Sequence, residues 1–278
     1  MGGGGFLIKG ASRLARIGVQ AAFPLRCWQC DSLYAPLEKS KSLGAVEAAT
    51  PSSFGCLMNA FICPHCASGY APVQHPLCHA CGQPYRTDQG IDHLCADCLS
   101  HPMAFTTARA AGLYAPPLKT LIHQFKYQGR CELARPLGRL LWDALIRFYD
   151  PKQIDLIVPV PLHWFRRFRR GFNQAALLVR DWRQFAADAG MTWKPGAVAR
   201  HLMNRRRRTP AQTGLGKQQR RANLKDAFVV PQTDIVNGKR VLLVDDVLTT
   251  GATAVECTKA LKSAGADTVR VLTLARAV

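Results

Sequence analysis

The larger, C-terminal part of the sequence predicts an α/β domain with a mostly parallel sheet, and the first hundred residues predict a small cysteine-rich unit ahead of it. Two observations predict the sheet: mainly apolar runs at 154–161, 241–244 and 269–274, of which 241–244 is continuous, and amphipathic segments between them. Strands that are apolar throughout and separated by helices are typical of a parallel sheet covered on both faces. The cysteine-rich unit is predicted because nine of the eleven cysteines fall between positions 27 and 98.

The predicted helices share apolar residues at helical spacing. We expect them over 118–125, 133–148, 175–187 and 257–264. Pro116 and Pro117 precede the first of these segments, where proline can open a helix, and Gly190 is an end signal for the third. The alternation of these helices with the apolar runs is what defines the α/β class.

The composition is that of a folded and strongly basic protein. Its 278 residues carry 37 Lys and Arg against 18 Asp and Glu, a net charge of +19, and 48% of them are hydrophobic. This hydrophobic fraction argues against disorder, and the charge indicates anionic partners such as phosphates or nucleic acid. No apolar run approaches the roughly 18 residues that a membrane-spanning helix needs. We therefore expect no membrane span.

The cysteines predict two structural zinc sites. Eight of them form four CxxC pairs, which are Cys27/Cys30, Cys63/Cys66, Cys78/Cys81 and Cys95/Cys98. A CxxC turn places two thiolates on one side of a tight turn, which is half of a tetrahedral zinc shell, so four such turns predict two zinc ions. Pairing in sequence order gives one site from the first two pairs and one from the last two, and interleaved pairing is the alternative.

The segment between positions 63 and 98 favours zinc for a second reason. It is short, polar and rich in Pro, His and Gly, so it needs metal-binding energy to fold. A disulfide framework is the alternative, and it requires an oxidising compartment. Because nothing in the sequence resembles an export signal, we expect reduced thiols and a cytoplasmic protein. Residues 1–24 are expected to form a basic extension, with a targeting peptide as the alternative.

The strand-loop-helix pattern at 241–253 is the strongest indication of chemistry. Asp245 and Asp246 come where the strand ends, and a loop of small and hydroxylated residues opens a helix, namely Thr249, Thr250, Gly251, Ala252 and Thr253. Backbone amides, hydroxyls and the positive end of a helix dipole suit a phosphate monoester. Carboxylates suit sugar hydroxyls or a hydrated magnesium ion. The pattern therefore predicts a site for a sugar phosphate with Mg²⁺.

This stretch resembles the phosphoribosyl pyrophosphate (PRPP) signature of type I phosphoribosyltransferases. The four CxxC pairs and five further segments are similar to the ComF family, with its ComFC and GntX-like members; those segments are 125–127, 158–161, 170–174, 208–212 and 221–224. The resemblance covers residues 25–278. It implies a type I phosphoribosyltransferase fold preceded by a double zinc ribbon, and a link to natural competence and the use of imported DNA.

Composition, together with the resemblance, divides the chain into a basic extension at 1–24, a double zinc ribbon at 25–102 with an inserted loop near 37–55, and a phosphoribosyltransferase domain at 103–278. The resemblance also implies a role for each matched residue. Asp245 and Asp246 would contact the ribose hydroxyls and help to hold Mg²⁺, and the loop 249–253 would bind the 5′-phosphate. The pyrophosphate loop would be formed by Pro159, Val160 and Pro161. The flexible catalytic loop would contribute Arg207, Arg208, Thr209, Gln212 and Arg221.

Two basic clusters flank the predicted pyrophosphate site. One contains Arg166, Arg167, Arg169 and Arg170, and the other includes Arg205 and Arg206. Aromatic residues, among them Phe172, interleave the first cluster, and such mixtures are common in proteins that bind single-stranded nucleic acid. The alternative is that the aromatic rings pack in the core and the arginines are a solvated face.

Two functional hypotheses follow. The first is a Mg²⁺-dependent phosphoribosyltransferase, a glycosyltransferase that moves a pentosyl group from PRPP to an acceptor that the sequence leaves open. We expect the acceptor pocket to lie in a hood near 113–129. The second is a non-catalytic protein that binds single-stranded DNA and uses PRPP as a regulatory ligand. Competence or DNA-processing proteins would be partners in either case.

Overall fold

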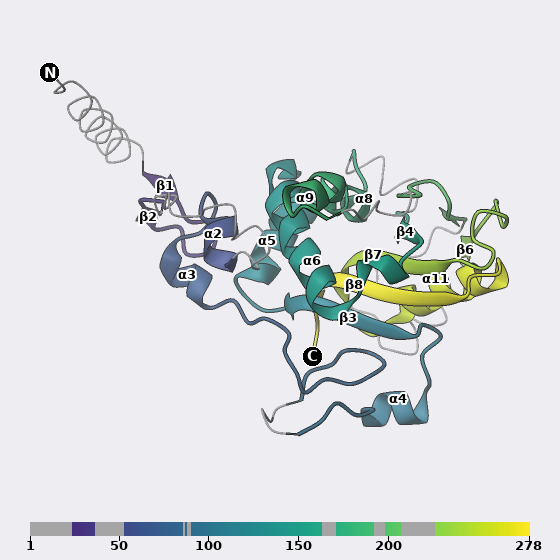
Figure 1. The fold of residues 1–278 in the computed structure, drawn as a ribbon. Coiled ribbons are helices and arrows are strands. Elements are labelled where there is room, and N and C mark those ends of the chain that lie inside the picture. Colours follow the sequence, from purple (N-terminus) through teal and green to yellow (C-terminus); the bar gives the residue numbers. More distant parts are fainter. Residues whose placement is uncertain are drawn as a thin grey trace, which may run out of the picture.

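The computed structural model describes residues 24–36, 53–85, 87, 90–162, 171–191, 198–206 and 226–278. Its centre is a four-stranded sheet (Figure 1) in the order β3 (Thr107–Leu113), β8 (Thr268–Arg276), β7 (Arg240–Leu248) and β4 (Leu156–Pro159). Each neighbouring pair is parallel, which confirms the predicted fold class. Most of the predicted extension (1–23) and most of the predicted insertion (37–52) lie outside the described residues.

Helices cover both faces of the sheet. On one face lie α5 (Leu118–Tyr127), α6 (Ala134–Phe148), α8 (Gln174–Leu178) and α9 (Trp182–Asp188), and on the other lies α11 (Ala252–Ser263). Side chains along β7 alternate between two apolar cores: Leu242 and Val244 pack with the first group of helices, and Val241 and Leu243 pack with α11. The continuous apolar run in β7 is therefore explained by burial on both sides.

The segment 175–187 forms two helices where the sequence predicts one. The chain turns between α8 and α9, and the Trp182 indole N–H then donates to the Gly138 carbonyl in α6 at 3.1 Å. A Cβ at Gly138 would lie 2.5 Å from the Leu178 carbonyl oxygen, so the two helices touch backbone to backbone at this point. Burial of the completely covered Trp182 ring, at 0% exposure, explains the break in the helix.

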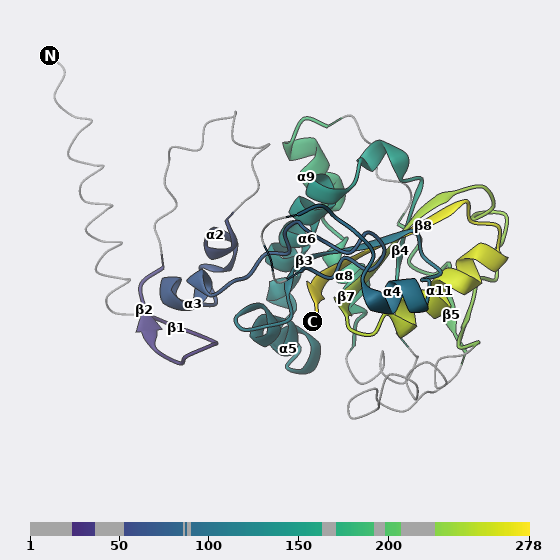
Figure 2. The same cartoon turned by 90° about the horizontal axis from the view of Figure 1, so that it is seen from below.

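The first cysteine-rich lobe (24–36 and 53–70) packs beside α5 and α6, as Figure 2 shows. It contains the antiparallel pair β1 (Leu25–Arg26) and β2 (Leu33–Tyr34) and the helices α2 (Phe54–Met58) and α3 (Pro64–Ser68). Phe54 and Met58 belong to the same core cluster as Trp142 of α6. The Tyr70 hydroxyl donates to the Ala111 carbonyl in β3 at 2.7 Å. The lobe therefore shares its apolar core with the α/β unit.

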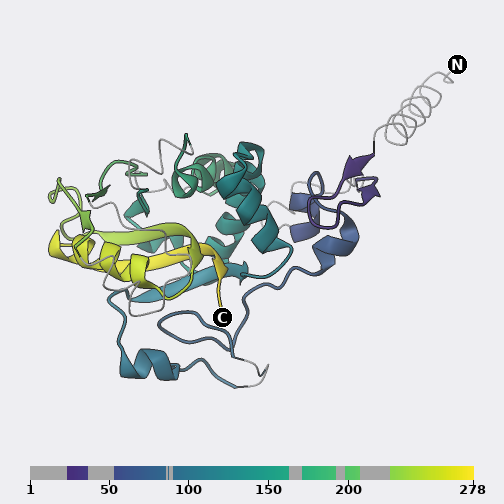
Figure 3. The same cartoon turned by 180° about the vertical axis from the view of Figure 1, so that it is seen from behind.

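The second cysteine-rich lobe (71–85, 87 and 90–106) is a long irregular segment. Its first residues contact the end of α6, where Arg147 donates to the Val73 carbonyl, and its helix α4 (Ala96–Ser100) lies on the side of the sheet away from α6 (Figures 1 and 3). Its backbone joins the edge strand β3, because the amide of Ala108 donates to Ala80 at 2.7 Å. Gly82 has φ of +66°, and a Cβ there would lie 2.3 Å from the Ala108 carbonyl oxygen. The lobe thus covers an edge that would otherwise be open to pairing with another chain.

Strand β3 is absent from the predicted elements because its residues are small. Its sequence is Thr-Ala-Arg-Ala-Ala-Gly-Leu, which lacks a strong apolar pattern. The small residues admit close neighbours, since a Cβ at Gly112 would lie 2.5 Å from the Tyr70 ring. The remaining short elements are η2 (Cys131–Leu133), η3 (Pro151–Gln153), β5 (Asn204–Arg205) and β6 (Phe228–Val229). Among the described residues, no helix is long and apolar enough to cross a membrane.

Candidate zinc centres and sugar-phosphate site

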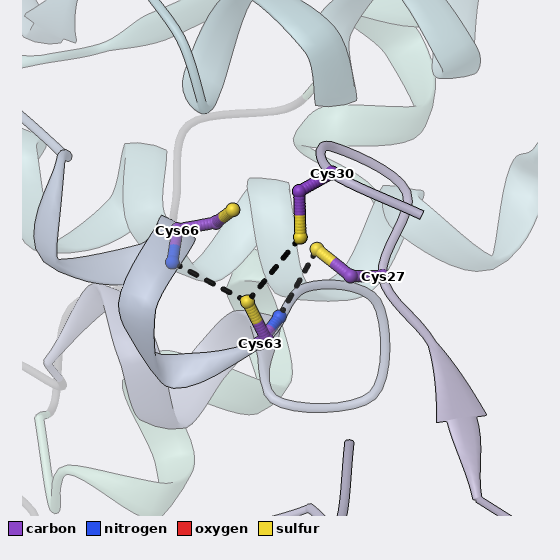
Figure 4. A group of neighbouring side chains, drawn as sticks. All are labelled: Cys27, Cys30, Cys63 and Cys66. Atoms are coloured by element: carbon purple, nitrogen blue, oxygen red, sulfur yellow. Dashed lines mark hydrogen bonds between the residues drawn. The ribbon is translucent and has the colours of Figure 1, made fainter. Parts of the chain in front are cut away.

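The first four thiols form one cluster (Figure 4). The Sγ atoms of Cys27, Cys30, Cys63 and Cys66 all lie within 4.8 Å of one another. Cys30 Sγ and Cys63 Sγ are 3.8 Å apart, which matches the edge of a tetrahedron built on Zn–S distances of about 2.3 Å and is far from a disulfide bond of about 2.0 Å. All eleven cysteines are free of disulfides.

The last four thiols form a second cluster of the same kind. Cys78, Cys81, Cys95 and Cys98 meet the same distance criterion, and Cys81 Sγ and Cys95 Sγ are 3.8 Å apart. In each cluster a backbone amide donates to a sulfur, from Cys63 to Cys27 at 3.3 Å and from Cys95 to Cys78 at 3.4 Å. The thiols are therefore grouped in sequence order and not interleaved, and Cys56 lies outside both groups.

The thiols do not all ionise readily without a cation. Hydrogen bonds from Ser32 lower the pKa of Cys30 to about 6. Burial, together with the neighbouring thiols, raises the pKa of Cys66 and of Cys98. A set of four thiolates therefore needs a positive ion at its centre, and binding of that ion displaces protons. Two four-cysteine sites of this geometry suit Zn²⁺.

The predicted acids lie inside the C-terminal half of β7, because the strand continues to Leu248 and does not end at Val244 as the sequence predicts. The backbone amide of Asp246 donates to Asp245 Oδ1 at 2.8 Å, and Lys126 Nζ lies 2.6 Å from Asp246 Oδ1. Lys126 comes from α5, inside the segment predicted as the hood, and the ion pair is largely buried, with exposed fractions of 15% and 13% for the two side chains. Sequence reasoning assigned no role to Lys126, although the family-like segment 125–127 contains it.

The charges at this site are unevenly balanced. Burial raises the pKa of Asp245 to about 7, and the charge of Asp246 adds to this. Lys126 and Arg205 oppose the rise without cancelling it. Burial lowers the pKa of Lys126, but the ion pair with Asp246 outweighs burial and holds that pKa above its usual value. The positive charges of Lys126 and Arg205 therefore do not fully offset the burial of Asp245 and the charge of Asp246.

The residues that follow the acids form a tight turn into α11. Gly251 has φ of +76°, a left-handed conformation that favours glycine, and α11 begins at the next residue. The amide of Ala252 donates to Thr250 Oγ1 at 3.4 Å. The first amides of a helix have no partner within the helix, and the helix dipole makes this end positive. The loop and the first turn of α11 together can bind a phosphate group.

The loop after β4 lies directly beside the acids. Pro159 is in register with Val244, the residue before Asp245, and the amide of Val160 donates to the Val244 carbonyl at 2.8 Å. The Asn173 side-chain amide donates to the Val160 carbonyl at 3.1 Å and fixes the loop from its other side. The structure thus brings the predicted pyrophosphate loop, the acids and the phosphate loop to one edge of the sheet.

The described part of the basic clusters contributes to this same edge. The Arg205 guanidinium lies over the Phe228 ring at 5.4 Å and opposes the rise in the pKa of Asp245, whereas Arg206 is exposed. Phe172 packs on Phe125 at 5.6 Å, so this aromatic ring belongs to the core. The other predicted residues of the basic clusters and the catalytic loop lie outside the described residues; they are Arg166, Arg167, Arg169, Arg170, Arg207, Arg208, Thr209, Gln212 and Arg221.

The fold and these sites define a phosphoribosyltransferase-like protein with a double zinc ribbon. Residues 184–277 match the phosphoribosyl transferase domain family, and residues 57–99 match the double zinc ribbon domain family. Competence protein F of Haemophilus influenzae is 33% identical over 231 residues, which cover 78% of this chain and 97% of the relative. The DNA utilization protein YhgH of Escherichia coli O157:H7 is 36% identical, covering 77% of this chain and 90% of the relative.

A more distant relative is competence protein ComFC of Streptococcus pneumoniae, which is 25% identical over 224 residues that cover 77% of this chain and 87% of the relative. Both family models and these relatives agree with the resemblance in the sequence. The chain belongs to the ComF family of competence and DNA utilization proteins.

Proposed function

We propose that the protein binds PRPP with Mg²⁺ at the C-terminal edge of its parallel sheet and transfers the phosphoribosyl group to an acceptor. The observation that carries the proposal is the meeting of three parts at this edge: the acids Asp245 and Asp246, the phosphate loop that ends at Gly251, and the β4 loop held to Val244. Ligands of open parallel sheets bind at this edge. The two structural sites would hold zinc ions.

Magnesium fits the donor set. Asp245 and Asp246 offer carboxylate oxygens, which Mg²⁺ prefers, and Lys126 alone does not compensate both of them. Mg²⁺, when bound, would supply positive charge to the leaving pyrophosphate. Asp245 and Asp246 would hold the ion, and their remaining oxygens would accept hydrogen bonds from the ribose hydroxyls.

The chain's residues supply the rest of the chemistry. Departure of pyrophosphate from the anomeric carbon would leave positive charge on the ribose, and the partly buried carboxylates of Asp245 and Asp246 would favour that charge. The loop at Val160 would face the leaving group, since its backbone is fixed next to the acids. The Lys126 ammonium, which now pairs with Asp246, would be available to donate to an oxygen of the pyrophosphate.

Calorimetric titration with PRPP in the presence and absence of Mg²⁺ tests the proposal. We expect binding that requires Mg²⁺, followed in a screen of nucleobases, amines and nucleic-acid fragments by release of pyrophosphate with one acceptor class. Failure of the wild-type protein to bind PRPP would contradict the proposal. Binding without release for any acceptor would instead favour a regulatory ligand.

The family relationship also favours a role with DNA. The relatives are named for competence and DNA utilization, and the basic charge near the site extends to the exposed Arg206. We propose that single-stranded DNA binds beside the PRPP site, in the cytoplasm, with DNA-processing proteins as partners. A reducing compartment agrees with eleven cysteines that form no disulfide.

Salt dependence distinguishes a DNA contact from a solvated surface. We expect the variant Arg206→Gln/Arg207→Gln/Arg208→Gln to bind a single-stranded oligonucleotide with a slope of log K against log salt that is shallower by about 2, because each phosphate contact contributes about 0.7. Fluorescence anisotropy at several salt concentrations measures the slope. Zinc content and the melting temperature serve as the controls for folding, and an unchanged slope would exclude this run as the DNA contact.

A further inference from the structure

A buried arginine at the end of β8 holds the backbone that leads into the phosphate loop. Arg276 is only 7% exposed. One of its terminal nitrogens, Nη1, donates to the carbonyl oxygen of Leu248 at 3.1 Å and also to that of Thr249. These are the last residue of β7 and the first residue of the loop. Arg276 therefore fixes the point at which the chain leaves the sheet and begins to surround the phosphate site.

The other terminal nitrogen of Arg276 contacts the second zinc cluster. Nη2 lies 3.3 Å from Gln83 Oε1 and 3.8 Å from Cys81 Sγ, a member of that cluster. Arg276 and Cys81 are 195 positions apart in the sequence. One guanidinium thus spans the distance between a cysteine of the zinc ribbon and the carbonyls of the phosphate loop.

The positive charge of Arg276 makes this contact depend on the charge of the second cluster. No Asp or Glu among the described residues forms an ion pair with it. A buried guanidinium requires an opposite charge nearby. Zn²⁺ with four thiolates formally carries two negative charges. A loaded second cluster would therefore supply the counter-charge that keeps the guanidinium in place.

A second side chain joins the same two regions independently. Met103 packs against the cluster of Cys78, Cys81 and Cys98, and also against the apolar core that contains Leu248 and Ala252. A Cβ built on Gly251 would lie 4.0 Å from Met103 Sδ, so the methionine contacts the phosphate loop at its left-handed glycine. The second cysteine-rich lobe thus supports the loop at two points.

We propose that Arg276 is a positioning residue through which the zinc-loaded second cluster holds the phosphate loop in its binding conformation. The zinc ribbon is then a part of the PRPP site and not only a separate folding unit. For its ligand, this inference rests on the proposed function. Coupling between two binding events is reciprocal, so PRPP must also strengthen the binding of zinc at the second cluster.

The variant Arg276→Met tests the contact. We expect it to retain two zinc ions per chain and to bind PRPP about tenfold more weakly, a typical size for coupling between sites. Without any ligand, the amides of residues 249–253 should exchange hydrogen faster than in the wild type. The matched control is Arg109→Met, because Arg109 also donates to this lobe, at the His79 carbonyl (3.1 Å), but makes no contact with the loop. The control should change neither quantity.

A second experiment measures zinc binding, and its first result comes from the wild-type protein. Chelator competition measures the zinc affinity of the second cluster, which we expect to increase with saturating PRPP in the wild type. The increase in zinc affinity should be absent in Arg276→Met. It should also be absent in Asp245→Asn/Asp246→Asn, and this second variant is the control for zinc that free PRPP binds in solution. Equal PRPP affinity and equal hydrogen exchange in wild type and Arg276→Met would overturn the inference. If the wild type binds no PRPP, the proposed function fails, while faster exchange in Arg276→Met would still support the link to the loop.

Discussion

The double variant Asp245→Asn/Asp246→Asn should bind PRPP in the presence of Mg²⁺ at least about a hundredfold more weakly than the wild type. Each carboxylate would make charge-assisted hydrogen bonds worth about 1.5–3 kcal/mol, so loss of both removes about 3 kcal/mol or more. The acids are partly buried beside Lys126, where water replaces the lost contacts poorly. Isothermal titration calorimetry at fixed Mg²⁺ measures the change.

The control for this variant is Asp267→Asn. Asp267 is exposed in the turn before β8, at the opposite end of the sheet, so its neutralisation changes the net charge without touching the site. We expect its affinity for PRPP to equal that of the wild type. If the double variant bound PRPP as tightly as Asp267→Asn does, the acids would have no part in binding, and the proposed site would be wrong.

The raised pKa of Asp245 gives the same site a pH dependence. Because burial and Asp246 raise this pKa to about 7, Asp245 is protonated in acid and gains its charge as the pH rises through about 7. Affinity for PRPP with Mg²⁺ should therefore increase over this range, and Asp245→Asn should lose that part of the dependence.

The stability of the ligand-free protein should change in the opposite sense. The folded state binds more protons than the unfolded state between the ordinary carboxyl pKa and about 7, so the free energy of unfolding falls as pH rises there.

The sequence predicts those elements whose pattern is local. The apolar run 241–244 of β7, the acids that follow this run within the strand and Gly251 are close together in the chain, so this half of the site can be read directly. The CxxC spacing identifies the eight cysteines in the same way. Their grouping into two sites depends on tertiary structure, and only the distances between sulfur atoms distinguish sequence order from interleaving.

The residues that the sequence does not reveal are those that act across long separations. Lys126 reaches Asp246 from a helix 120 positions earlier, and Arg276 reaches Cys81 across 195 positions. Each of these contacts is made by a single long side chain, so no periodicity or residue spacing in the sequence indicates it. Strand β3 is not predicted for a different reason. Its residues are small because Tyr70 and the second lobe approach it closely, and small residues do not form the apolar pattern by which a strand is predicted.

The two zinc clusters differ in what surrounds them, and this difference predicts unequal effects on stability. Cys27 and Cys63 of the first cluster belong to the main core, together with Trp142 and Trp182. The buried cysteines of the second cluster form a small core of their own. Loss of zinc from the first cluster should therefore open the main core, whereas loss from the second should loosen mainly its own lobe.

The variant Cys63→Ser should accordingly lower the melting temperature by about 10 °C or more, since loss of a structural metal and disruption of a core each cost several kcal/mol. The variant Cys98→Ser should lower it clearly less. Calorimetric melts together with metal analysis measure both effects, and each variant should retain one zinc ion per chain where the wild type holds two.

The control is Cys56→Ser. Cys56 is an exposed thiol of the first lobe outside both clusters, so its substitution should change neither zinc content nor melting temperature. Equal losses of stability in Cys63→Ser and Cys98→Ser would show that the first cluster does not support the main core, and a wild type with fewer than two zinc ions would contradict the double-site assignment itself.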